Sequence, residues 1–182
     1  MRAVEAYKRW RHTHGFGVHS PFAFDLVTTV VRPGSCYAHY GYEDIDNSIV
    51  RTSLPDSRRH ARMLLRLAAF LDVRSAFLPK DAYSPPFRAA LRAANSGMWL
   101  TSAMAEIHKC QLVCTTADFV PLHTLCEFLK HSGAIISIRA LPEDWCRTLF
   151  DALPEGLMLY SKDAAIMVNR PGMQKISYSI RL

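Results

Sequence analysis

Two histidines in the N-terminal stretch HGFGVHSPF have the spacing that most suggests chemistry. His14 and His19 lie on either side of two glycines, so both imidazoles could reach one substrate as acid and base. The same stretch has a structural interpretation, which we favour. The glycines allow a tight turn, and Ser20 followed by Pro21 is typical of the start of a helix.

A second group of candidates combines aromatic rings with a carboxylate. His39, Tyr40 and Tyr42 could line a pocket with stacking surfaces, although packing between helices and sheet is the simpler interpretation. Asp118 follows an apolar segment that resembles a strand. A carboxylate at the end of a strand could be catalytic, but the cap of the following helix is its more common role.

Several function classes have no support in the sequence. There is no HExxH or GxSxG motif, so we expect neither a metal site nor a serine esterase. The five cysteines are an odd number and form no CxxC pair. This count argues against both a disulfide framework and a zinc knuckle.

The chain of 182 residues is basic, with a formal net charge of +6. Arg58, Arg62 and Arg66 recur at helical spacing and predict a basic ridge, either a solvated face or a surface for an anion or nucleic acid. The N-terminus is charged, and no apolar run reaches the roughly 18 residues that span a bilayer. We therefore expect a cytoplasmic protein whose partner is a small molecule or a protein, with nucleic acid a minor alternative and no membrane.

Short apolar runs alternate with amphipathic segments from residue 74 onward, which predicts an α/β fold with a mostly parallel sheet. We expect helices over 1–12, 21–31, 57–71, 86–94, 103–109, 120–131 and 142–153, and strands over 75–78, 98–101, 111–115, 134–138, 157–160, 164–168 and 174–182. Residues 1–72 would form a helical segment that packs on the sheet, and residues 73–182 a compact domain. The last segment alternates between apolar and polar residues, so we expect it to be an antiparallel, half-exposed strand.

Both ends of the chain resemble the class I S-adenosylmethionine-dependent methyltransferases, in particular a bacterial group with an N-terminal HGxGxHSPF segment. The matching features are that segment, the Tyr-rich stretch over 37–45, and the closing strands over 156–160, 164–170 and 174–182. The resemblance implies a Rossmann-like, mostly parallel sheet into which the last strand enters antiparallel. It also implies S-adenosylmethionine as the cofactor.

The middle of the chain departs from that family at the cofactor loop. The family carries an acidic-x-Gly-x-Gly loop after the first strand, whereas residues 77–86 contain three prolines and no glycine. Glycine is needed where the backbone approaches a ligand closely, and proline removes a backbone donor. The residues left as candidates for cofactor contact are Lys80, Asp81, Ser84, Thr101, Thr115 and Thr116.

The middle is also short, because a βαβ unit takes about 30 residues or more. At least one βα unit of the family is therefore missing or compressed. The sequence favours a methyltransferase-fold protein with a degraded cofactor site, serving as a non-catalytic binding or structural protein. The alternative is a small active S-adenosylmethionine-dependent methyltransferase with an atypical loop, so whether the chain is an enzyme stays open.

Overall fold

The computed structural model describes residues 2–13, 17–33, 41–52, 57–80, 84–116, 119–131, 133–137 and 141–181. The helices are α1 (Arg2–Thr13), α2 (Pro21–Leu26), the π-helical turn η1 (Val27–Val31), α3 (Gly41–Thr52), α4 (Ser57–Phe70), α5 (Ser84–Ala94), the 3-10 helix η2 (Met104–Lys109), α6 (Leu122–His131) and α7 (Glu143–Ala152). The strands are β1 (Ser75–Phe77), β2 (Trp99–Thr101), β3 (Leu112–Thr115), β4 (Gly133–Ser137), β5 (Gly156–Tyr160), β6 (Ala165–Asn169) and β7 (Ile176–Ser179).

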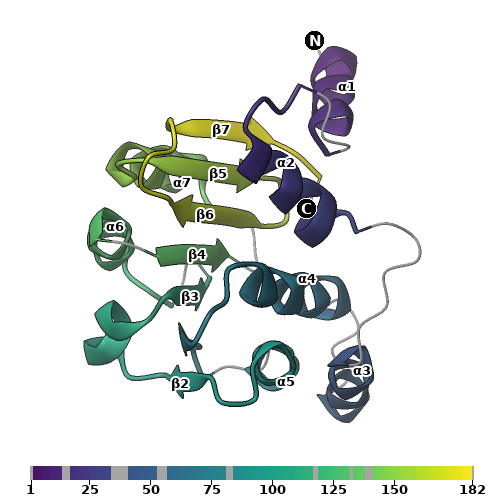
Figure 1. Ribbon diagram of the computed structural model, residues 1–182, viewed down its shortest axis with the longest axis vertical. Helices are drawn as coiled ribbons and strands as arrows, with labels where there is room; N and C mark the ends of the chain where they lie inside the picture. The colour runs from purple at the N-terminus through teal and green to yellow at the C-terminus, as the bar shows by residue number, and fades with distance from the viewer. Residues whose placement is uncertain are drawn as a thin grey trace.

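These strands form one mixed sheet in the order β2-β1-β3-β4-β6-β5-β7. Strand β6 is antiparallel to both of its neighbours, whereas the other pairings of the sheet are parallel. The predicted α/β class with a mostly parallel sheet and a C-terminal hairpin is therefore confirmed. Figure 1 shows the strands from β2 at one edge to β7 at the other.

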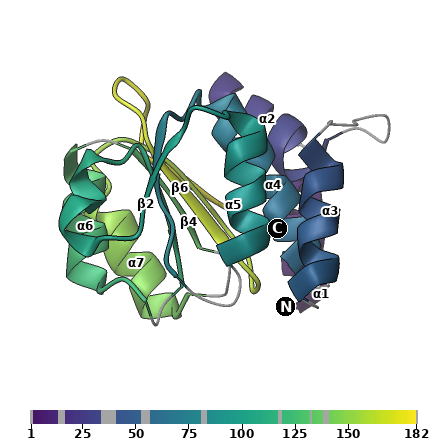
Figure 2. The same cartoon turned by 90° about the horizontal axis from the view of Figure 1, so that it is seen from below.

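Helices cover both faces of the sheet (Figure 2). On one face, buried residues of α2, η1, α4 and α5 share a core with alternate residues of the strands, among them Leu112, Ile136 and Leu159. On the other face, α6 and α7 form a second core with Val113, Ile135 and their neighbours. Period-2 alternation along each strand divides its side chains between the two cores.

The N-terminal part begins its second helix as predicted. The Ser20 hydroxyl accepts a hydrogen bond from the Ala23 amide at 3.3 Å, and Pro21 is the first helical residue.

Helix α3 was not predicted from the sequence. It lies outside α4 and α5, further from the sheet (Figure 2), with Ile45 and Ile49 buried against the core.

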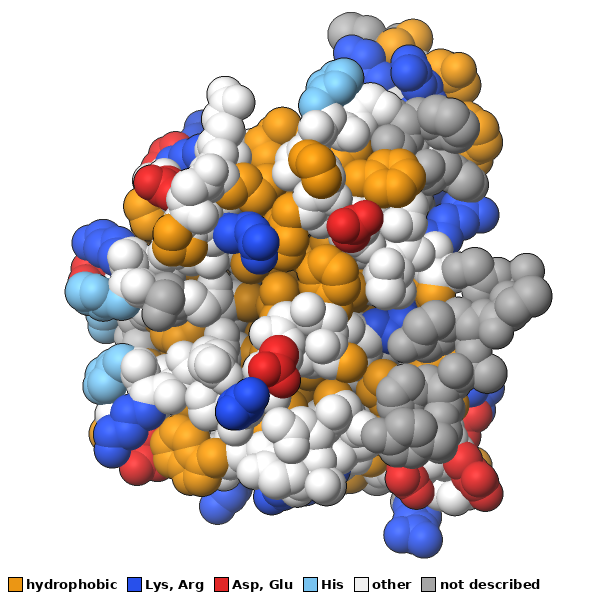
Figure 3. Space-filling model, viewed as in Figure 1, with side chains coloured by type: hydrophobic (Ala, Val, Ile, Leu, Met, Phe, Trp, Pro, Cys, Tyr) orange, Lys and Arg blue, Asp and Glu red, His pale blue; other side chains and the backbone are white. Residues whose placement is uncertain are grey.

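Helix α1 carries its apolar side chains on the outside. Val4, Tyr7 and Trp10, which the sequence places on one side of a helix, are all exposed. The opposite side contacts β7, where the His12 ring meets the Tyr178 ring edge-on at 5.2 Å. Figure 3 shows hydrophobic side chains beside Lys and Arg over α1 at the top of the molecule.

The last strand corrects one sequence expectation. β7 pairs with β5 in parallel, from Leu157 opposite Ile176 to Tyr160 opposite Ser179, and is not antiparallel as predicted. The connection after β6 crosses the start of β5, so the chain enters the outer position in the same direction as β5. The alternation of residues fixes which face each side chain takes, but not the direction of the neighbouring strand.

Candidate functional site

The carboxyl ends of β1, β2, β3 and β4 lie at one edge of the sheet, because these strands are parallel. The chain turns from β1 outward to β2 and later back to β3 on the other side of β1, which makes the gap between β1 and β3 a topological switch point. Ligands of open α/β sheets bind outside the strand ends at such a point. The residues that follow β1, β2 and β3 therefore form the candidate site.

The first two residues after β1, Leu78 and Pro79, offer no free backbone donor. The Leu78 amide donates to the Thr101 carbonyl at 2.9 Å, and Pro79 has no N–H. Both residues are buried, and Leu78 is only 2% exposed. Lys80 follows and is exposed, whereas Asp81 lies outside the described residues.

The helix that follows this segment is also poor in donors. Helix α5 begins at Ser84 and continues with Pro85 and Pro86. The first four N–H groups of a helix have no partner in the helix and bind anions in many proteins. Two of these four positions are prolines in α5, so only Ser84 and Phe87 carry an N–H there.

The end of β2 holds a small polar network that the sequence did not predict. The Thr101 hydroxyl donates to a Glu106 carboxylate oxygen at 2.9 Å and accepts from the Ala103 amide at 3.1 Å. The other Glu106 oxygen lies 3.5 Å from the Lys109 ammonium. Glu106 belongs to η2, yet its carboxylate reaches back to the strand end. The sequence predicts only a short helix over 103–109, and nothing in its pattern indicates that the Glu106 side chain returns to the strand end.

The ends of β3 and β4 contribute buried hydroxyl groups. Thr115 and Ser137 are fully buried and are register partners on the neighbouring strands β3 and β4. The Thr115 hydroxyl donates to the Thr116 carbonyl at 2.9 Å, and Thr116 is buried as well. These hydroxyls lie within the protein rather than on an open surface. Asp118 lies outside the described residues.

None of the contacts that the described residues make joins the N-terminal candidate residues to this edge of the sheet. His19 is exposed in the segment before α2, and His14 lies outside the described residues. The Tyr42 hydroxyl accepts a hydrogen bond from Arg66 at 2.7 Å, and the Arg62 guanidinium lies 4.5 Å from the centre of its ring. Tyr42 thus packs between α3 and α4. His39 and Tyr40 lie outside the described residues.

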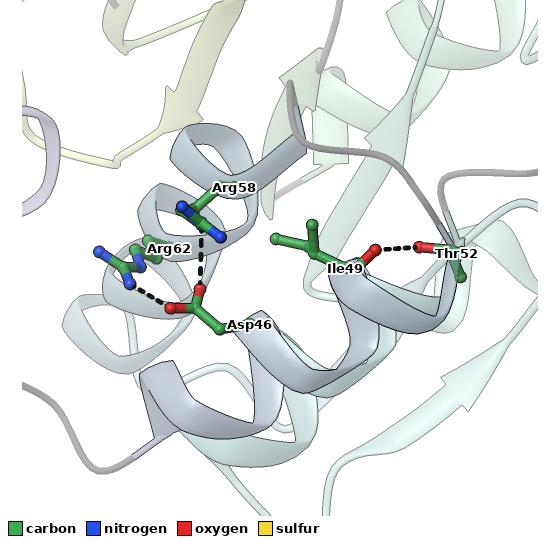
Figure 4. A network of polar contacts seen from close by, with 5 residues as sticks. All are labelled: Asp46, Ile49, Thr52, Arg58 and Arg62. Carbon is green, nitrogen blue, oxygen red and sulfur yellow. Dashed lines mark hydrogen bonds and ion pairs between the residues drawn. The ribbon is translucent and has the colours of Figure 1, made fainter.

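The arginines of the predicted basic ridge on α4 bind other groups of the protein itself. Arg58 and Arg62 both bind the Asp46 carboxylate of α3, at 3.2 and 2.7 Å (Figure 4). Arg66 is only 7% exposed and donates to the Val30 carbonyl at 2.7 Å. The interpretation as a solvated face is therefore wrong for Arg66, and the ridge joins α4 to α3 and η1.

The four thiols in the described part of the chain are poor nucleophiles. Burial raises the pKa of Cys110 from 9.0 to about 11, with the nearby Glu106 carboxylate adding to the effect. Burial also raises the pKa of Cys114, Cys126 and Cys146. Because the thiolate is the reactive form, covalent catalysis by these residues has no support.

No family model, curated protein or solved structure matches this chain. Within the described ranges, no three His, Cys, Asp or Glu side chains are placed to hold a metal ion. No helix in that part of the chain is both long and apolar enough to cross a membrane.

Proposed function

We propose that this chain is a methyltransferase-fold protein without a working S-adenosylmethionine site, serving as a non-catalytic binding or structural protein. The observation that carries the proposal is that, among the described residues of this segment and the start of α5, Leu78 and three prolines offer no free backbone N–H. The Leu78 N–H is bonded to Thr101, and Pro79, Pro85 and Pro86 have none. A cofactor carboxylate held by backbone N–H groups needs those donors.

The strand order supports the fold part of the proposal. The family that the sequence resembles has a mostly parallel sheet whose last strand enters antiparallel; this sheet is also mostly parallel, but its antiparallel strand is β6, between β4 and β5, and the last strand β7 is parallel to β5. Residues 102–111 connect β2 to β3 and hold only the 3-10 helix η2. This short connection fits the missing βα unit that the sequence indicates.

A small active methyltransferase is the alternative, and Glu106 is the observation that favours it. Enzymes with related sheets use an acidic residue at the end of the second strand to accept hydrogen bonds from ribose hydroxyls. The Glu106 carboxylate lies next to Thr101 at that strand end. Since Glu106 already accepts from Thr101 and faces Lys109, we favour a structural role.

A nucleic-acid adaptor is the least supported alternative, because Arg58, Arg62 and Arg66 bind groups of the protein itself. Binding of a polynucleotide with a steep salt dependence would be its signature.

Isothermal titration calorimetry with S-adenosylmethionine and S-adenosylhomocysteine tests the proposal. We expect no binding tighter than about 100 μM, which corresponds to roughly −5.5 kcal/mol. A dissociation constant below that value, weakened in Glu106→Gln and unchanged in the surface control Arg88→Gln, would establish the alternative instead.

A further inference from the structure

A hollow of 390 Å³ lies between α7 and the strands β5 and β7. It is separate from the candidate cofactor edge, because β3, β4, β6 and β5 lie between β1 and β7 in the sheet. Its volume falls within the range of small-molecule sites, about 300–1,000 Å³. Residues of α1, of α7, of both strands and of the β5–β6 turn line it.

The pattern of β7 explains why the hollow exists. Tyr178 and Ile180 point into the core on the α4 side of the sheet. Ser177 and Ser179 therefore point to the α7 side, where they line the hollow. A serine side chain is short, so the edge strand leaves space beside α7. Phe150 of α7 and Met158 of β5 supply an apolar wall.

The lining is positively charged. Arg9, Arg147 and Lys162 contribute three cations, against one carboxylate from Glu143. Arg147 lies 3.9 Å from Glu143, and Lys162 lies 3.8 Å from Asp163; all four side chains are well exposed. Exposed pairs of this kind contribute about 0–1 kcal/mol, so an incoming anion can compete for Arg147 and Lys162.

Three hydroxyl groups add neutral donors to these cations. Tyr160, Ser177 and Ser179 line the hollow; Tyr160 and Ser177 are exposed, and Ser179 is half-buried. A hydroxyl can donate a hydrogen bond to an anion or accept one from a donor, and rotation about its C–O bond decides which of the two it does. Cations and hydroxyls beside an apolar wall are a combination typical of sites for ligands with one charged end.

We propose that this hollow binds a small organic anion, a carboxylate or a phosphate with a flat apolar body. The anionic group would bind Arg147 and Lys162 with help from Ser177 and Ser179, and the body would pack on Phe150 and Met158. The inference does not depend on the fate of the cofactor site, because none of the lining residues belongs to that edge.

Amide NMR titrations with phenyl phosphate and benzoate test the proposal, with benzyl alcohol as the uncharged counterpart. We expect saturable shifts at the amides of Lys162, Ser177 and Ser179 with a dissociation constant of about 1 mM or tighter, near −4.1 kcal/mol. Benzyl alcohol should bind at least about tenfold more weakly, and inorganic phosphate should also bind more weakly because it has no apolar body. Which of the two anions binds better identifies phosphate or carboxylate as the preferred charge.

The variants Arg147→Gln and Lys162→Gln should each weaken binding by about fivefold to tenfold, because each removes one charge-assisted contact. Arg88→Gln on α5 is the matched control, since it removes one exposed charge elsewhere and should leave the affinity unchanged. Equal affinities in wild type, Arg147→Gln and Lys162→Gln would overturn the proposal. So would shifts near Lys80 and Thr101 with none near Lys162, or no saturable shift at 5 mM of either anion.

Discussion

At the scale of single residues, the candidate cofactor site is limited mainly by the hydrogen bond that the Leu78 amide already makes. The absence of glycine after β1 was visible in the sequence, and it predicted a backbone unsuited to close approach. The bond from Leu78 to the Thr101 carbonyl could not be predicted, since it depends on the register of β1 with β2. The hydrogen bond between Thr101 and Glu106 could not be predicted either, because the direction of a side chain after a strand depends on the following turn.

The buried thiols lead to a prediction about alkylation. With a pKa of about 11, Cys110 is about 0.1% thiolate at pH 8, against about 10% for a thiol with a pKa of 9. We expect iodoacetamide at pH 8 to modify Cys110 at least about a hundredfold more slowly in the native protein than in urea. Peptide mass spectrometry measures both rates, with the partly exposed Cys126 as the internal comparison. Equal native rates for Cys110 and Cys126 would contradict the buried position of Cys110.

The buried guanidinium of Arg66 leads to a prediction about stability. Tyr42→Phe removes the hydroxyl that accepts from Arg66 at 2.7 Å, and should lower the free energy of unfolding by about 1–2 kcal/mol. Arg66→Ala removes the whole bridge to Val30 and Tyr42, and should cost about 2–4 kcal/mol. Urea denaturation measures both values. The exposed Arg88→Ala should change stability by less than about 0.5 kcal/mol; a similar loss there would mean that burial of Arg66 is not the cause.

At the scale of elements, two glycines with positive φ provide a matched pair. Gly156 has φ +119°, and a Cβ there would meet the Val168 carbonyl oxygen at 2.1 Å. Gly172 has φ +78°, and a Cβ there would meet nothing within 4 Å. The close approach of β5 and β6 therefore requires glycine at position 156, whereas no neighbouring atom excludes a side chain at position 172.

Alanine at these two positions should separate backbone strain from steric overlap. Gly172→Ala should cost about 1–2 kcal/mol in the free energy of unfolding from strain alone. Gly156→Ala should cost at least about 2 kcal/mol more, because the β5–β6 pairing must shift to admit the methyl group. Equal losses for the two variants in urea denaturation would contradict the close approach at Gly156.

Most elements could be predicted because their apolar periodicity is bounded by clear stops. Strand β4 and helix α7 begin and end within a few residues of the predicted ranges, since Gly133 and Pro142 mark their starts. Helix α3 could not be predicted, because its stripe has only Ile45 and Ile49 and packs on other helices rather than on the sheet. The parallel direction of β7 could not be predicted either, as pairing partners are set by the tertiary fold.

At the scale of the whole molecule, the two edges of the sheet differ in what they offer a ligand. Among the described residues after β1, the Leu78 amide is bonded to Thr101 and Pro79 has no N–H, whereas the side of β5 and β7 holds a hollow lined by cations and hydroxyl groups. The division at residue 72 into a helical segment and a sheet domain stays a prediction.

The central claim, that the edge after β1 does not bind the cofactor, is tested most directly by following its amides in an NMR titration with S-adenosylhomocysteine. The reporters are the amides of Leu78, Phe87, Thr101, Glu106 and Thr116, which surround the carboxyl ends of β1, β2 and β3. We predict no saturable shift at these amides up to about 1 mM ligand, which corresponds to binding weaker than about −4.1 kcal/mol. Saturable shifts at Leu78 and Thr101 with a dissociation constant below about 100 μM would contradict the account.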